Sequence, residues 1–109
     1  MNVIFLPEVV DYLEHLVPIL YENGYFGMCE TAKKYIDDLV DDIEANLPTK
    51  LHRPALPYFD KYGKDMKYAV FKKNRRTSWY AFFETYEEEG IVSYLVRYIA
   101  NNHMVAQYL

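Results

Sequence analysis

The spacing of hydrophobic residues in this chain changes near residue 64, from a helical period to the alternation typical of β-strands. A short run rich in β-branched residues at positions 3–6 predicts a first strand. Apolar residues three or four positions apart then predict two helices. One covers residues 7–22, and the other follows a turn at residues 23–27 and stops at Pro48.

An irregular connector with three prolines follows at residues 48–64. After it, alternation predicts three antiparallel strands, at residues 66–73, 77–86 and 91–99. The predicted fold is a single α+β domain over residues 1–109, with the element order β-α-α-β-β-β. In this fold an α-helical hairpin packs on one face of an antiparallel sheet.

Both faces of the predicted sheet are apolar. Along the second of the three strands, Trp79, Ala81 and Phe83 point to one face, whereas Tyr80 and Phe82 point to the other. Because the helical hairpin covers only one face, we expect the other face to be covered by the C-terminal tail, by a partner or by a ligand.

The formal net charge of −4 conceals an uneven distribution of charge. Residues 1–47 hold ten acidic and two basic residues, whereas residues 48–109 hold six acidic and ten basic residues. Four of these cations fall in the stretch KKNRR, residues 72–76, which we call the basic turn. The C-terminal half is therefore able to present a basic surface, suited to phosphate groups, on an acidic protein.

Several classes of protein are disfavoured by the sequence. No apolar run approaches the ~18 residues of a membrane span, and the N-terminus lacks the features of a signal peptide. Cys29 is the only cysteine, so no intrachain disulfide forms and a cytoplasmic location is expected. No spacing of His, Cys, Asp or Glu resembles a zinc site, and there is no phosphate-cradling glycine loop. We expect neither a metal nor a cofactor.

Two stretches carry a resemblance to a known family, KYGKDMKYAVFKKNRRTSWYAFFE at residues 61–84 and YLVRYIANNHMVAQYL at residues 94–109. With the preceding strand and acidic helical hairpin, they resemble the RelE/ParE superfamily of bacterial type II toxins over essentially the whole chain. The resemblance implies a cytoplasmic toxin, neutralised by a cognate antitoxin that wraps it as it folds. A homodimer and a toxin–antitoxin hetero-oligomer both stay open, and no membrane partner is expected.

The superfamily contains two kinds of toxin. RelE-like members are mRNA interferases, which enter the ribosome and cut mRNA without a metal. ParE-like members share the fold, lack the catalytic side chains and poison DNA gyrase. A degenerate toxin retained only for its partner complex is a third alternative.

The resemblance implies catalytic roles for Arg76, His103 and Tyr108. We also predict RNA contacts for the basic residues Lys72, Lys73, Arg75, Arg76 and Arg97. Two departures favour the gyrase-binding alternative, since Trp79 and Asn102 stand where the RNA-cleaving members place arginines.

Metal-free RNA cleavage needs a base for the 2′-hydroxyl proton, cations beside the phosphorus and an acid for the 5′-oxygen. The end of the first antiparallel strand, the start of the second and the end of the third share one sheet edge. We therefore expect the basic turn, His103 and Tyr108 to border one cleft. Simpler roles stay open for them, namely a solvated turn, a hydrogen bond at a strand end and packing on the sheet.

Overall fold

The structure is a computed structural model, which describes residues 2–22, 29–73, 75 and 77–105. Its elements are β1 (Asn2–Phe5), α1 (Pro7–Glu22), α2 (Cys29–Asn46), the 3-10 helix η1 (Leu47–Thr49), β2 (Arg53–Pro54), the 3-10 helix η2 (Pro57–Lys61), β3 (Lys67–Lys72), β4 (Ser78–Glu88), β5 (Ile91–Asn101) and α3 (Asn102–Val105). The five strands form one sheet in the order β1-β5-β4-β3-β2. No helix within the described ranges is long and apolar enough to cross a membrane.

The predicted α+β class and the positions of the main elements are confirmed, but the prediction of a purely antiparallel sheet is wrong. β1 pairs in parallel with β5, from Asn2 opposite Ser93 to Phe5 opposite Val96. The turns between neighbouring strands fix the directions of β3, β4 and β5, whereas β1 meets its partner across most of the chain. The predicted turn at residues 23–27 lies outside the described residues.

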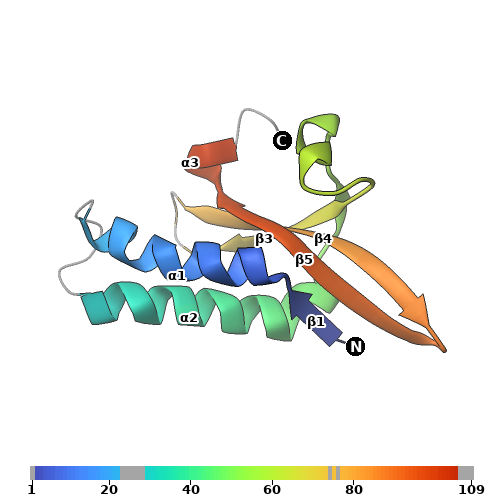
Figure 1. The fold of residues 1–109 in the computed structure, drawn as a ribbon, viewed down its shortest axis with the longest axis horizontal. Helices are drawn as coiled ribbons and strands as arrows, with labels where there is room; N and C mark the ends of the chain where they lie inside the picture. The colour runs from blue at the N-terminus through green and yellow to red at the C-terminus, as the bar shows by residue number, and fades with distance from the viewer. Residues whose placement is uncertain (1, 23–28, 74, 76, 106–109) are drawn as a thin grey trace.

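The helical hairpin covers one face of the sheet (Figure 1). Leu13, Ile36 and Leu39 point inward from the helices and belong to the same buried cluster as Trp79 and Phe83 of β4. The helical period of the first half and the alternation of the second half therefore meet in one core, as the sequence predicts.

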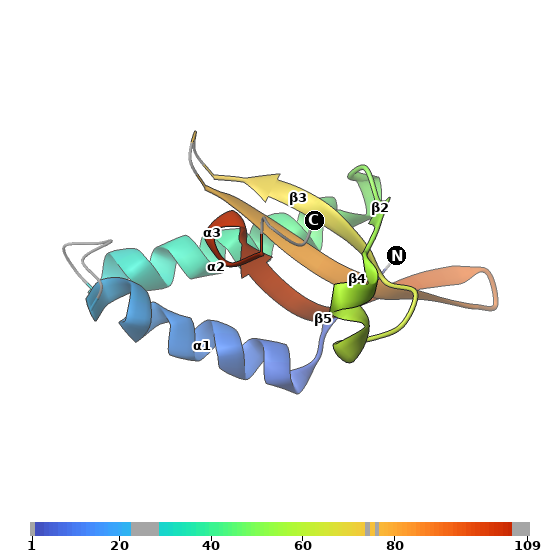
Figure 2. The same cartoon turned by 90° about the horizontal axis from the view of Figure 1, so that it is seen from above.

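The connector, rather than a partner, covers a large part of the opposite face, so our expectation for that face was wrong in this region. In Figures 1 and 2 the η2 turn lies across the sheet from the helices. Phe59 of η2 is only 1% exposed, and its ring stacks on Phe82 with 4.3 Å between centroids. Tyr62 stacks on Tyr98 at 3.9 Å. Burial, followed by a hydrogen bond with Tyr62, raises the pKa of Tyr98.

A β-bulge in β5 changes which of its side chains point to each face of the sheet. Phe83 pairs with Val96 and Phe82 pairs with Tyr98, so Arg97 is the extra residue. Residues 96 and 99 consequently both belong to the helical side, whereas Tyr98 packs with the connector. Without this shift, strict alternation would send residues 96 and 98 to the same face.

The bulged Arg97 ties the connector to the sheet. Its Nε donates a hydrogen bond to the carbonyl oxygen of Tyr62 at 2.7 Å, and its Nη1 lies 3.3 Å from Glu84 Oε2. Gly63 lies against this pair, and a Cβ built there would come within 2.7 Å of Glu84 Oε1 and 2.8 Å of Arg97 Cδ. The absence of a side chain at position 63 lets the connector approach this closely.

The buried position of Phe59 yields a prediction for stability. Phe59→Ala should lower the free energy of unfolding by about 3–5 kcal/mol, because it removes a buried ring and leaves a cavity on the second face. Urea unfolding followed by tryptophan fluorescence measures this loss. Tyr58→Ala, at a neighbouring ring that is 36% exposed, is the matched control and should cost clearly less. Equal losses at the two positions would contradict the described packing.

Candidate nucleic-acid interface at the basic end of the sheet

Three distant segments meet at one end of the sheet, where the basic turn joins β3 to β4. Lys72 pairs with Ser78, and Trp79 pairs with Asn101 at the end of β5. α3 follows β5 directly and lies at this same end (Figures 1 and 2). The register thus brings the turn and the residues after β5 together, as the shared-edge argument predicts.

His103 of α3 contacts Thr77, the residue that follows the basic turn. Its Nε2 lies 3.4 Å from Thr77 Oγ1, at the long end of hydrogen-bonding distance, with donor and acceptor set by the imidazole tautomer. The side chain of His103 is exposed. An imidazole in this position is accessible to a substrate and lies next to the cationic segment, and imidazole side chains commonly act as general acids and bases in enzymes.

Asn102 anchors α3 to the start of β4. Its Oδ1 accepts a hydrogen bond of 3.0 Å from the backbone N–H of Ser78. Ser78 is the first residue of β4, one position before the β4–β5 pairing begins at Trp79, so the amide side chain supplies the acceptor in place of a strand. The residue that departs from the family pattern therefore has a structural role here, and it holds His103 beside the turn.

Trp79 and Lys73 both attach to Tyr35 of α2. The Trp79 Nε1–H donates to the Tyr35 hydroxyl at 2.8 Å, and the Lys73 ammonium lies 5.4 Å from the centre of the Tyr35 ring. A hydrogen bond from Lys34, with a smaller contribution from Lys73, lowers the pKa of Asp38. Trp79, at a position where the resemblance expects an arginine, is 1% exposed and part of the core.

Lys72 and Arg75 are exposed and form no ion pair with another residue that the structure describes. Lys73 is half-buried, and its backbone N–H donates to the carbonyl oxygen of Thr77 at 3.0 Å, which closes the turn. Lys72 and Arg75 are therefore both free to contact an anion. The arginine offers a planar fork that matches two phosphate oxygens, and the lysine offers a point charge.

Aromatic side chains continue the surface beyond Lys72. The rings of Tyr68 and Tyr80 meet edge-to-face with 5.9 Å between centroids, and Val70, which pairs with Tyr80, is 36% exposed. Partial burial, and then the proximity of Tyr68, raises the pKa of Tyr80, so its hydroxyl stays protonated at neutral pH. Partly exposed rings beside cations are the combination that single-stranded nucleic acids stack on and contact.

The structure places the remaining predicted site residues as follows. Arg97 lies beside the Phe82–Tyr98 pair, four residues or ~13 Å along β4 from Ser78, and its guanidinium is engaged by the connector. Arg76 and Tyr108 lie outside the described residues. Of the predicted site residues that the structure describes, Lys72, Lys73, Arg75 and His103 lie at the basic end of the sheet, and Arg97 lies apart from them.

Two residues of this region were missed by sequence reasoning. Tyr35 looks like an ordinary apolar position of α2, and no periodicity distinguishes its hydrogen bond to Trp79. Asn101, at the end of β5, has a buried side-chain oxygen with no hydrogen-bond partner in the structure. A buried acceptor without a hydrogen bond lowers the stability of the folded state by about 1–3 kcal/mol. Such groups are rare in native structures.

The described residues contain no group of three or more His, Cys, Asp or Glu arranged to hold a metal ion. Comparison of the chain with protein-family models, with curated proteins and with solved structures finds no match in any of the three.

The bond between Tyr35 and Trp79 can be tested directly. Tyr35→Phe should lower the free energy of unfolding by about 1–3 kcal/mol, since the indole N–H of a buried Trp79 would lose its acceptor. Chemical denaturation of the single variants and of Tyr35→Phe/Trp79→Phe completes a double-mutant cycle. The two losses should be clearly non-additive. Strict additivity would show that the hydroxyl and the indole do not interact.

Proposed function

We propose that this protein is the toxin of a type II toxin–antitoxin module and acts as a ribosome-dependent, metal-free mRNA endonuclease of the RelE-like kind. One observation carries the proposal. The exposed imidazole of His103 lies against Thr77, next to a turn whose Lys72 and Arg75 have no carboxylate partner among the described residues. A proton carrier beside free cations is what metal-free phosphodiester cleavage needs.

The proposed reaction uses the RNA's own 2′-hydroxyl as the nucleophile. His103 removes the proton from this hydroxyl, and the 2′-oxygen forms a bond to the adjacent phosphorus. Lys72, Arg75 and Arg76 stabilise the additional negative charge on the phosphoryl oxygens. The bond between phosphorus and the 5′-oxygen breaks, and Tyr108 donates a proton to that oxygen. The products are a 2′,3′-cyclic phosphate and a 5′-hydroxyl end.

The surface beside the turn supports single-stranded RNA as the substrate. Tyr68 and Tyr80 lie on the sheet face next to Lys72, so a nucleotide whose phosphate meets the turn has rings within reach of its base. The aromatic contact is tolerant of sequence, because every base has a stacking face. Selection of the cut site would then depend on the ribosome more than on base recognition by this chain.

A ParE-like toxin that binds DNA gyrase is the second candidate. It is favoured by the structural roles of Trp79 and Asn102, which replace expected arginines and are committed to Tyr35 and to the backbone of Ser78. In this alternative the same basic end would be a protein-binding surface, and His103 would have no part in chemistry. A degenerate toxin that only binds its partner would neither cleave mRNA nor inhibit gyrase.

The nuclease proposal predicts that Arg76→Ala and His103→Ala abolish toxicity on induced expression and leave ribosome-bound mRNA uncut. His103→Ala should keep the fold, since His103 is exposed and most surface substitutions change stability by no more than about 0.5 kcal/mol. Mapping of mRNA 5′ ends on ribosomes measures cleavage, and thermal unfolding checks the fold. Lys64→Ala is the matched control, because Lys64 is an exposed cation that precedes β3, at the opposite end of this strand from the basic turn.

Three outcomes separate the alternatives. Loss of cleavage in both variants with full activity of the Lys64→Ala control supports the nuclease. Unchanged toxicity in both variants, together with inhibition of gyrase supercoiling by the unmodified protein, supports the gyrase-type toxin. A protein that is harmless and inactive in both assays contradicts both proposals.

The toxin proposal also predicts an antitoxin. Co-expression with the reading frame adjacent to its gene should relieve growth arrest and yield a stable complex of the two proteins. Partner-induced ordering is expected, since antitoxin tails of this kind fold as they bind. Circular dichroism of the separate and mixed proteins measures the gain of structure. Indifference of growth, yield and spectrum to the adjacent frame would contradict the prediction.

A further inference from the structure

A second exposed cation stands on the sheet face that carries the rings of Tyr68 and Tyr80. Arg53 of β2 pairs with Tyr68 of β3, which in turn pairs with Phe82 of β4. Residues that pair on neighbouring strands point to the same face, so Arg53 lies on the side of the sheet where Phe59 covers Phe82. Arg53 is exposed and forms no ion pair with any residue that the structure describes.

A row of side chains joins Arg53 to the basic turn. Tyr68, Val70 and Lys72 are alternate residues of β3, so they point to one face, and Tyr80 pairs with Val70. Tyr68 and Lys72 are four residues or ~13 Å apart along the strand. The row therefore has an exposed cation at each end and two tyrosine rings between them. We call this row of residues, with Arg53, the sheet strip.

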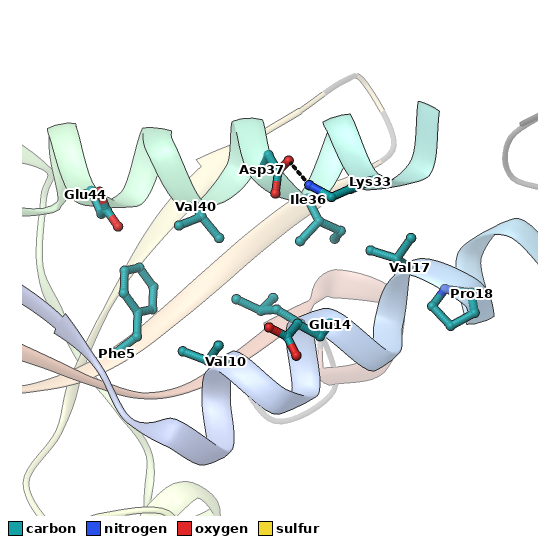
Figure 3. A pocket seen from close by; sticks show the side chains of 11 residues that line it. Phe5, Val10, Glu14, Val17, Pro18, Lys33, Ile36, Asp37, Val40 and Glu44 are labelled. Carbon is teal, nitrogen blue, oxygen red and sulfur yellow. Dashed lines mark hydrogen bonds and ion pairs between the residues drawn. The ribbon is translucent and has the colours of Figure 1, made fainter. Parts of the chain in front are cut away.

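The helical layer carries the opposite charge. Figure 3 shows the groove between α1 and α2, which is lined by the carboxylates of Glu14, Asp37 and Glu44. Lys33 also lines this groove, but its ammonium is already paired with Asp37 at 2.8 Å. A polyanion would be repelled by this surface, whereas the cations of the sheet strip attract it.

Cations separated by aromatic rings correspond to the repeating chemistry of a single-stranded nucleic acid. The phosphates of the strand carry its negative charge, and its unpaired bases offer faces on which tyrosine rings stack. At a stacked rise of ~3.4 Å per nucleotide, the ~13 Å between Tyr68 and Lys72 spans about four nucleotides, and fewer in an extended strand. The sheet strip thus fits a short single strand with a phosphate at each end.

We propose that Arg53 is a second phosphate-binding subsite, which holds single-stranded RNA a few nucleotides away from the bond that is cut at the basic turn. The inference rests on the proposed function, which supplies RNA as the ligand. Arg53 binds one phosphate through the planar fork of its guanidinium, and Lys72 contacts another at the other end of the strip. Tyr68 and Tyr80 stack on the bases between these phosphates. None of these contacts involves His103, so binding and cleavage are separable.

The test measures binding of a single strand that cannot be cut. A labelled uridine pentanucleotide with 2′-O-methyl groups lacks the nucleophile of the proposed reaction, and fluorescence anisotropy with the full-length protein gives its affinity. Arg53→Ala should weaken binding about tenfold, because a charge-assisted contact to phosphate is lost. The same variant should lower the slope of log affinity against log salt concentration by about 0.7, the value for one phosphate of a single strand.

Lys67→Ala is the matched control, since both variants remove one positive charge. Lys67 is exposed and next to Tyr68, but it pairs with Phe83 and therefore points to the face that the helices cover. Its loss should change the affinity by no more than about twofold, because salt screens a charge on the far face of the sheet. Arg53→Lys keeps the charge and should recover part of the affinity that Arg53→Ala loses. Thermal unfolding should show that these variants at exposed positions keep the fold.

The stacking surface and the length of the strip have tests of their own. Tyr68→Leu keeps an apolar side chain beside the second core and should weaken binding of the pentanucleotide by about fivefold or more, because one base loses its stacking partner. Shortening the strand to a dinucleotide should cost the unmodified protein more affinity than it costs Arg53→Ala. Only the unmodified protein has both ends of the strip to engage the longer strand.

Two kinds of result overturn the subsite. Equal losses in Arg53→Ala and Lys67→Ala would show a general effect of net charge. An unmodified protein that does not bind the pentanucleotide, or an affinity that Arg53→Ala leaves unchanged, also contradicts it. The nuclease is judged separately, by mapping of mRNA ends on ribosomes. Binding that depends on Arg53 without any cut mRNA refutes the nuclease and keeps the subsite, whereas cut mRNA with binding that ignores Arg53 does the reverse.

Discussion

The fold depends on a central strand, β4, that is apolar on both faces. Phe83 and Trp79 must be covered on one side and Phe82 on the other, and all three are buried to 1% exposure or less. The helical hairpin supplies one layer, and the connector supplies the other through Phe59. A chain of 109 residues therefore forms three layers, which are the sheet and one layer on each of its faces, and the second core is built from a segment without regular periodicity.

The predictable part of the fold follows from local patterns, and the unpredictable part from contacts between distant residues. Alternation along β4 correctly placed Trp79, Ala81 and Phe83 on one face of the sheet, and the structure shows that the helices cover this face. The role of Phe59 was not visible, because residues 48–64 have no repeating pattern that would show which way their three aromatic side chains, Tyr58, Phe59 and Tyr62, point. The bulge at Arg97 was equally hidden, because a one-residue shift leaves the composition of a strand unchanged.

The candidate site divides in the same way. The proximity of the basic turn and His103 follows from strand directions alone, and the contact between His103 and Thr77 confirms it. The side chains that hold this arrangement, Asn102 on Ser78 and Tyr35 on Trp79, depend on hydrogen bonds between residues 24 and 44 positions apart. Arg97, for which the sequence predicts an RNA contact, has a role in the fold, because its Nε donates a hydrogen bond to the carbonyl oxygen of Tyr62.

The uneven charge explains how an acidic protein presents a basic end. The exposed carboxylates of α1 and α2 lie on the helical layer, whereas Lys72 and Arg75 lie at the tip of the sheet. At physiological ionic strength charges are screened beyond about 8 Å, so an anion at the turn experiences mainly the nearby cations. The acidic helical layer and the basic end meet at Asp38 and Lys73, which are close enough for the lysine to help lower the pKa of the aspartate. The acidic helices and the basic end of the sheet thus form separate surfaces, and each surface can select a partner of its own.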